Sequence, residues 1–239
     1  MKSFIIHVTS NKKSVEYANI CLQSCQGKFD AQLFEGVTPD TLHTYEAQYP
    51  FTHMVDSRAK DFSEENKLLY KIKKSCFMNH VRLWNKCIEL NETIAVIEQD
   101  SFCVRSWQPV AFDDVLIMNF ESAWNQRIFK GFWKEGHKKP LIKEGIFDYE
   151  NNKMMHYHRK NNYHDSYRIP GTAAYAVTVQ GATKLLASLK KNGWEQSDYF
   201  VNNKNVRLQA FGPEFFTFKM PNLNTVSYTH LTLPTILLV

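Results

Sequence analysis

The sequence contains 239 residues, of which 44% are apolar, 14% are aromatic and 22% are charged, and its net charge is +5 at pH 7. These proportions are typical of a globular protein and exclude a disordered or fibrous chain. The basic residues are spread along the sequence rather than gathered on one element, so we expect no nucleic-acid partner, although the mild positive charge suits anionic ligands.

The beginning of the chain predicts a βαβ unit. The pattern indicates a strand over 4–8, a helix over 14–26 and a second strand over 31–34, and Gly27 is well placed to end the helix. A βαβ opening is typical of the nucleotide-binding half of an α/β sheet.

The turn between that first strand and the helix would approach a bound nucleotide. Thr9, Ser10 and Lys12 lie in or next to this turn and are candidate nucleotide contacts. The alternative is that these residues only cap the helix.

The next segment combines a loop with a long helix. Residues 36–60 show little periodicity and predict a loop. Asp61 followed by Glu64 has the form of an N-terminal cap, and apolar residues at three- and four-residue spacing predict a helix that runs to Leu90, either continuous or broken near Lys74. His80 lies on this apolar stripe, so it is either a hydrogen-bonded core histidine or a residue that supports a functional site.

Residues 93–100 form the most informative stretch of the chain. Its apolar, β-branched run predicts a strand buried on both faces, near the centre of a sheet. Ligands of open α/β sheets bind outside the carboxyl ends of the strands, where Glu98 and Asp100 would face the same way while Gln99 points elsewhere. Two carboxylates there suit Mg²⁺ or Mn²⁺ shared with phosphate oxygens, and the alternative is ordinary turn chemistry.

Residues 75–100 together resemble the central block of the family 25 glycosyltransferases, the lipooligosaccharide and collagen sugar transferases. The family pattern is a Gly-Cys-x-x-Ser-His helix with a Trp, a Glu-Leu-Asn-Glu-like turn, and an apolar strand that ends in Glu-Asp-Asp. Two positions depart from it, because Asn79 precedes His80 where the family has Ser, and Gln99 replaces the middle acid. The charge of the site is therefore lower by one.

The resemblance implies a GT-A-like (Rossmann-like) α/β fold, with one mixed, mainly parallel sheet and helices on both faces. It also implies an enzyme that transfers a sugar from a nucleotide-sugar donor, with UDP-galactose as the suggested donor, to a hydroxyl group of a glycan or protein-bound acceptor. Asp100, with Glu98 beside it, would hold Mn²⁺ or Mg²⁺ against the departing diphosphate, Glu98 would also contact the donor, and the anomeric centre would be inverted. The rival interpretation, motivated by Gln99 and the unusual first turn, is a catalytically degenerate module that binds nucleotide sugar or glycan without turnover.

The middle of the chain is harder to interpret. A strand is predicted over 115–119, and Asp113 and Asp114 at its start are expected to be turn residues. Residues 121–167 are aromatic and basic, so they could form the acceptor side of a sugar site or an irregular insertion with its own small core. The histidines in this segment are expected to lie in a polar loop, with metal binding as the alternative: His156, His158 and His164.

A second stretch, over 169–186, resembles the same family, which has Gly-x-x-x-Tyr, a small apolar strand, a turn with Gly-Ala, and Lys-Leu-Leu on a helix. Gly171 and the small residues after it allow a ligand to approach the backbone closely. The helix is expected to end at Gly193. By resemblance, Asp198 is the candidate base for the acceptor hydroxyl, Glu195 is the alternative, and helix capping is a third role for Asp198.

The last predicted strands, over 206–210 and 215–218, complete the sheet, and we expect one domain over 1–225. Residues 226–239 are similar to a translated sequencing adapter and are expected to be a non-native tail. Five cysteines without a Cys-x-x-Cys pair predict neither a zinc site nor a disulfide framework. Without a signal-peptide core or an apolar run of about 20 residues, a cytoplasmic protein with no transmembrane segment is expected.

Overall fold

The computed structural model describes residues 1–49, 67–122, 144–148, 156–157, 166–167, 169 and 171–218. Several predictions from the sequence lie outside these residues. They are the helix cap at Asp61, most of the aromatic segment, the loop around His158 and His164, and the tail over 226–239.

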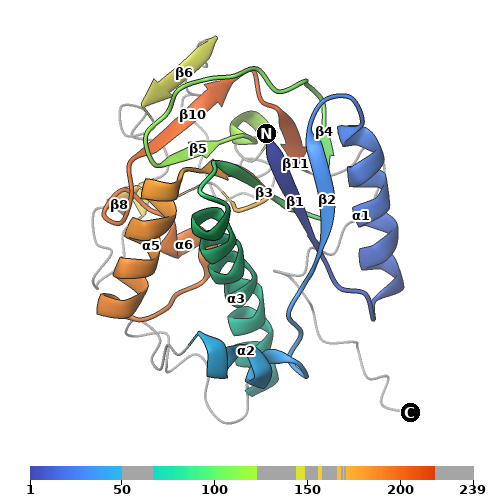
Figure 1. The fold of residues 1–239 in the computed structure, drawn as a ribbon, viewed down its shortest axis with the longest axis vertical. Coiled ribbons are helices and arrows are strands. Elements are labelled where there is room, and N and C mark those ends of the chain that lie inside the picture. The colour runs from blue at the N-terminus through green and yellow to red at the C-terminus, as the bar shows by residue number, and fades with distance from the viewer. Residues whose placement is uncertain are drawn as a thin grey trace, which may run out of the picture.

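In the described part of the chain, seven strands form one sheet in the order β2-β1-β3-β9-β5-β10-β6 (Figure 1). Their bounds are β1 (Lys2–His7), β2 (Asp30–Glu35), β3 (Ile94–Glu98), β5 (Val115–Ile117), β6 (Gly145–Asp148), β9 (Ala174–Val177) and β10 (Leu208–Gly212). Strands β1, β2, β3, β5 and β10 share one direction, whereas β9 and β6 run against their neighbours. The predicted mixed, mainly parallel sheet is confirmed.

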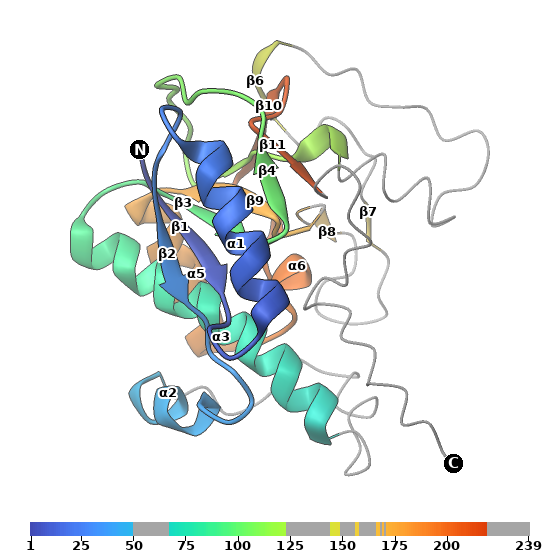
Figure 2. The same ribbon diagram turned by 90° about the vertical axis from the view of Figure 1, so that its right-hand side faces the viewer.

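Helices cover both faces of this sheet. Their bounds are α1 (Lys12–Cys25), α2 (Leu42–Gln48), α3 (Lys67–Leu90), α5 (Val179–Asn192) and α6 (Ser197–Phe200). Helix α1 packs on one face, and Figure 2 shows it in front of the strands, while α3 and α5 pack in the core of the opposite face. The α/β layering implied by the sequence is confirmed.

Strand β3 connects the two cores. Its four apolar residues are fully buried, and they alternate between the core under α3 and α5, which takes Ile94 and Val96, and the core under α1, which takes Ala95 and Ile97. A strand buried on both faces has no polar alternation, and β3 lies between β1 and β9 inside the sheet. This arrangement confirms the expectation of an interior strand.

Helix ends agree with their sequence signals. Asn11 caps α1 through a hydrogen bond from the Ser14 N–H to its Oδ1, and Gly27 follows the helix with a φ of 69°. Helix α5 begins after Thr178, whose hydroxyl oxygen accepts the Gly181 N–H, and it ends before Gly193. Both helices therefore begin at a polar side chain that satisfies a backbone donor.

Three elements differ from the prediction. Helix α2 lies within the predicted loop, where Leu42 alone among its residues is buried, so it has no long apolar stripe to signal it. Strand β6 at the sheet edge was not predicted, because its residues are only partly buried. Strand β11 (Phe216–Phe218) does not complete the main sheet, since it pairs with β4 (Ser101–Cys103) in a separate ribbon.

Two short strands, β7 (His156–Tyr157) and β8 (Ser166–Tyr167), pair with each other.

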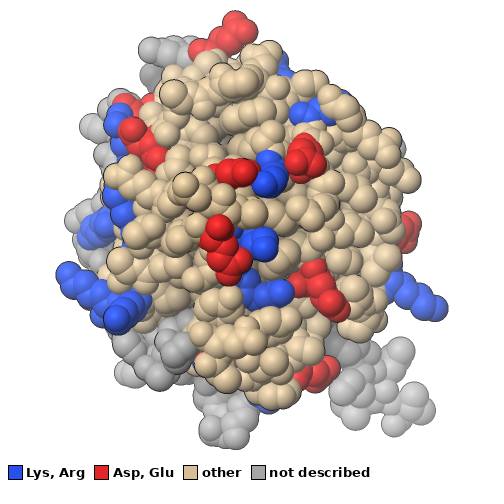
Figure 3. Space-filling view, viewed as in Figure 1, with Lys and Arg blue, Asp and Glu red and all other residues tan. Residues whose placement is uncertain are grey.

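On the face shown in Figure 3, Lys and Arg side chains lie next to Asp and Glu instead of gathering into a basic patch. Within the described ranges, none of the helices combines the length and the apolar character that crossing a membrane requires.

Candidate active site at the carboxyl end of the central strand

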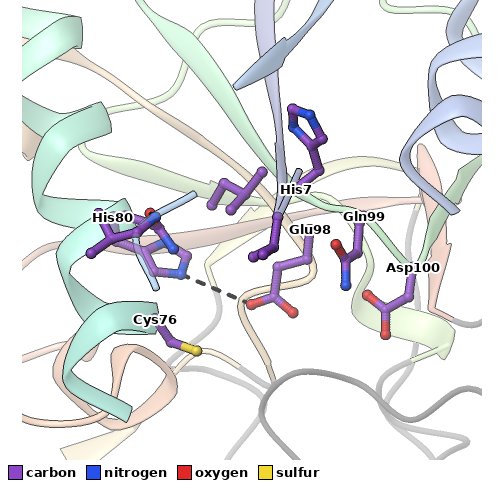
Figure 4. Close-up of a pocket in the computed structure, with 10 residues that line it drawn as sticks. His7, Cys76, His80, Glu98, Gln99 and Asp100 are labelled. Atoms are coloured by element: carbon purple, nitrogen blue, oxygen red, sulfur yellow. Dashed lines mark hydrogen bonds and ion pairs between the residues drawn. The ribbon is translucent and has the colours of Figure 1, made fainter. Parts of the chain in front are cut away.

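A pocket opens where β1 and β3 end, beside α3 (Figure 4). Strand β1 and its turn contribute residues 6–8, α3 contributes Cys76, Asn79 and His80, and β3 with its turn contributes residues 98–100. The pocket is open to solvent, and the empty space in and above it is about 490 Å³. The structure therefore places a pocket at the sheet edge where the sequence predicted a ligand.

Glu98 and Asp100 both line this pocket, but so does Gln99. The prediction that Gln99 points elsewhere is wrong. Strand β3 ends at Glu98 and the chain turns at the next two residues, so the alternation of a strand no longer applies there. All three side chains consequently belong to one site.

Gln99 is connected to the beginning of α1 through Ser14. The Ser14 hydroxyl oxygen accepts the backbone N–H of Val8, with an N···O distance of 2.7 Å, and the hydroxyl donates to Oε1 of Gln99. Ser14 is almost completely buried in the first turn of the helix. This network joins the end of β1, the start of α1 and the turn after β3.

The carboxyl group of Glu98 is largely enclosed, with its side chain 16% exposed. Burial and the nearby charge of Asp100 raise its pKa to about 8, the charge of Asp198 adds to the effect, and a hydrogen bond from the Thr172 hydroxyl, 2.5 Å from Oε1, opposes it. Asp100 itself is only 3% exposed. Two carboxyl groups this close, one of them with a raised pKa, create a place where a cation would be stabilised.

His80 is a hydrogen-bonded core histidine, as one of the two interpretations held, and it also lines the pocket. Tyr175 accepts the Trp84 indole N–H at 3.0 Å, so its own hydroxyl proton is directed to His80 Nδ1 at 2.9 Å. The proton of the neutral ring is then on Nε2, which lies 3.9 Å from Oε1 of Glu98. Burial lowers the pKa of His80 to about 3, so this buried histidine is neutral and presents an N–H toward Glu98.

The two candidate bases have different surroundings. Asp198 lies in α6, whose first residue, Ser197, places its hydroxyl oxygen 3.3 Å from that of Thr172, and the charge of Asp198 acts on Glu98. Glu195 is completely buried, and its Oε1 accepts the backbone N–H of Gln196 at 3.4 Å. The structure thus brings Asp198 toward the acidic pair and encloses Glu195.

The residues predicted from the first turn do not line the pocket. Thr9, Ser10 and Lys12 are exposed, and the Thr9 hydroxyl donates to Oε1 of Glu35 at 2.8 Å. The cap of α1 is Asn11 instead. The pocket is reached from this side by residues 6–8.

Gly171 adopts a φ of 136°, a backbone conformation that favours glycine, and the space where a Cβ would lie is open. Its neighbour Thr172 donates the hydrogen bond to Glu98. The sequence singled out Gly171 but not Thr172 or Ser14, and it marked Tyr175 as part of a motif without assigning it a role. Tyr175 could have been noticed as the Tyr of the second stretch that resembles the family, whereas nothing in the local sequence marks Ser14.

The pocket lies outside the carboxyl ends of the strands, which is where α/β proteins with an open sheet bind their ligands. The fold and the site therefore define a ligand-binding α/β protein of this class. Comparison of the sequence with family models identifies the family: the chain belongs to glycosyltransferase family 25 (LPS biosynthesis protein), whose model matches residues 1–201. It is therefore a glycosyltransferase, as the sequence motifs implied.

Similar solved structures include the galactosyltransferase LgtC in complex with donor and acceptor sugar analogues, at 9% identity and a TM-score of 0.38, covering 87% of this chain and 73% of that one. Mouse xyloside xylosyltransferase 1 in its apo form is also similar, at 10% identity and a TM-score of 0.34, covering 84% of this chain and 81% of that one. These distant likenesses add nothing to the family assignment. A comparison with curated proteins found no match.

Proposed function

We propose that this glycosyltransferase moves a sugar from a nucleotide-sugar donor to a hydroxyl group of a glycan or protein-bound acceptor. The observation that carries the proposal is the acidic pair Glu98 and Asp100, which lines the pocket at the end of the central strand, with Asp100 buried and the Glu98 side chain 16% exposed. UDP-galactose is the donor to test first, because the resemblance of the central block to lipooligosaccharide and collagen sugar transferases suggests it.

Glu98 and Asp100 would hold Mn²⁺ or Mg²⁺ in this proposal. Among the described residues no group of three or more His, Cys, Asp or Glu side chains could hold a metal ion. Two carboxylates still fit, because Mg²⁺ is commonly bound by one or two carboxylates together with substrate phosphates. When bound, the ion supplies positive charge that stabilises the departing diphosphate.

Asp198 is the proposed base. Its carboxylate would take the proton of the acceptor hydroxyl while the acceptor oxygen forms a bond to the anomeric carbon of the sugar. The bond from that carbon to the diphosphate oxygen breaks at the same time, and its electron pair leaves with the nucleoside diphosphate. A single displacement of this kind inverts the anomeric centre. Support for this role comes from the charge of Asp198, which helps to raise the pKa of Glu98.

His80 and Thr172 would position Glu98. The Thr172 hydroxyl and the Nε2–H of His80 both face Oε1, so Oε2 is the oxygen left for a ligand. The hydrogen bonds from Trp84 to Tyr175 and from Tyr175 to His80 keep the histidine in the tautomer whose Nε2–H can donate toward Glu98.

The test is the thermal stability of the full chain with UDP, with and without MnCl₂, for the wild type and Asp100→Ala. Bound ligand stabilises the folded state by mass action, so UDP should raise the melting temperature only when Mn²⁺ is present, and Asp100→Ala should abolish the rise. Asp30→Ala is the control, since it removes an exposed carboxylate at the amino end of β2, whereas the pocket lies at the carboxyl ends of the strands.

Turnover separates the two functions that the sequence left open. A transferase should release UDP from UDP-galactose when a galactose-terminated or other glycan acceptor is supplied, and Asp198→Asn should abolish the release while UDP binding persists. If UDP with Mn²⁺ stabilises the protein but no acceptor or donor supports turnover, the chain is a binding module. If neither UDP nor Mn²⁺ changes the melting temperature, the proposed site is refuted.

A further inference from the structure

We infer that Gln99 is a fixed hydrogen-bond donor of the pocket and that its amide nitrogen binds a phosphate oxygen of the nucleotide donor, an inference that rests on the proposed function. The family motif has an acid at this position, which could only accept hydrogen bonds when ionised. The amide nitrogen of Gln99 would therefore donate a hydrogen bond at a position where the family's acid could only accept one.

The orientation of the amide follows from the hydrogen bonds of Ser14. Because the Ser14 oxygen already accepts the Val8 N–H, its own proton is available to Gln99, and it is directed to Oε1. The reverse orientation would turn Oε1 toward Glu98 and Asp100, and in the cation-loaded site, where Glu98 would have lost its proton, two ionised carboxylates would repel it. The nitrogen must then be the atom that faces the acidic pair, and Figure 4 shows it on the side of the two carboxylates.

The amide is also held firmly. Gln99 is 8% exposed, and Ser14, which fixes its oxygen, is 1% exposed in the first turn of α1. The hydrogen bond between Gln99 and Ser14 occupies the amide oxygen, Oε1, and not the amide nitrogen. Neither N–H group of the amide has an acceptor among the residues that the structure describes, so both can serve the pocket.

The chemistry of the pocket indicates which ligand atom the amide meets. Glu98 and Asp100 flank Gln99 in the chain and offer only acceptors when ionised, so a cation that they held would attract phosphate oxygens to the same place. A neutral amide N–H can donate to such an oxygen without competing for the cation. A carboxylate at this position would instead add negative charge opposite the diphosphate.

The test compares two variants that both break the contact between Gln99 and Ser14. Gln99→Met removes the donor with little change of size, whereas Ser14→Ala removes the partner and leaves the amide. UDP affinity is measured by calorimetry at saturating MnCl₂, with uridine as a ligand that lacks phosphates. We expect Gln99→Met to weaken UDP binding at least tenfold, Ser14→Ala to weaken it about threefold or less, and neither to change uridine binding.

A second variant, Gln99→Glu, guards against misfolding, because its carboxylate can still accept the Ser14 hydrogen bond. It should bind Mn²⁺ alone at least as tightly as the wild type and bind UDP more weakly. Equal UDP affinity of Gln99→Met and Ser14→Ala would show that Gln99 is only a structural link and would overturn the inference. An equal loss for uridine would also overturn it. A wild type that fails to bind UDP with Mn²⁺ would instead refute the proposed function.

Discussion

Replacing Glu98 with Gln should stabilise the ligand-free protein at high pH and have little effect at low pH. Burial and the charge of Asp100 raise the pKa of this carboxyl group from 4.5 to about 8. Between these two values the folded state keeps a proton that the unfolded chain has released. The free energy of unfolding of the wild type therefore falls as the pH rises through this window, and the Gln variant lacks this contribution.

The magnitude follows from the two pKa values. Each pH unit between them changes the free energy of unfolding by at most about 1.4 kcal/mol. The Glu98 side chain is 16% exposed, which reduces the effect moderately. We expect the variant to gain roughly 2–4 kcal/mol over the wild type between about pH 5 and about pH 8.

The assay is urea unfolding of both proteins across that range without divalent metal. The difference between the two curves matters, because the contributions of all other titrating groups cancel in it. Gln keeps an oxygen that can accept the Thr172 hydroxyl, so the hydrogen bond to Glu98 is preserved. A difference in free energy of unfolding that does not change with pH would refute the claim that Glu98 holds its proton in the fold.

Three further variants test how the scaffold holds the site. Asp114→Ala should destabilise the fold by about 1–3 kcal/mol in urea unfolding, because the backbone N–H of Arg207 loses the fully buried carboxylate that accepts it at 2.8 Å, and Asp114→Asn, which keeps an acceptor oxygen, should cost less. Tyr175→Phe should cost about 1–3 kcal/mol by the same measurement, since it leaves the buried Trp84 indole N–H without its acceptor, and an unchanged free energy would contradict this network. Gly181→Ala should lower the melting temperature measurably, at a cost of about 1–3 kcal/mol or more, because the added methyl group would meet the backbone carbonyl of Asp114, and wild-type stability would show that α5 can shift away.

The sequence was most informative where the pattern is local. The apolar run before Glu98 predicted an interior strand because burial on both faces removes polar residues from that strand. The end of α1 at Gly27 and the end of α5 at Gly193 followed from the positive φ that glycine adopts after a helix. The same apolar run located the acidic pair, because Glu98 and Asp100 directly follow it and therefore lie at the end of the strand.

Some features of the fold have no local signal. Strand β9 lies antiparallel between β3 and β5, although its small apolar residues would fit a parallel strand equally well. Strand β11 has the composition of a sheet strand but pairs with β4. Strand neighbours are chosen by packing over the whole sheet, and a single strand's composition does not encode them.

The chemistry of the site depends on contacts between distant parts of the chain. The residues that orient Glu98 and Gln99 come from elsewhere: Thr172 is 74 positions from Glu98, and Ser14 is 85 positions from Gln99. The raised pKa of Glu98 likewise results from burial and neighbouring charges that exist only in the fold. The sequence by itself thus determined which acids stand at the end of the central strand and to which family the chain belongs. Only the tertiary structure decided which donors surround those acids and which of them keeps its proton, because hydrogen bonding and desolvation arise when separate elements pack together.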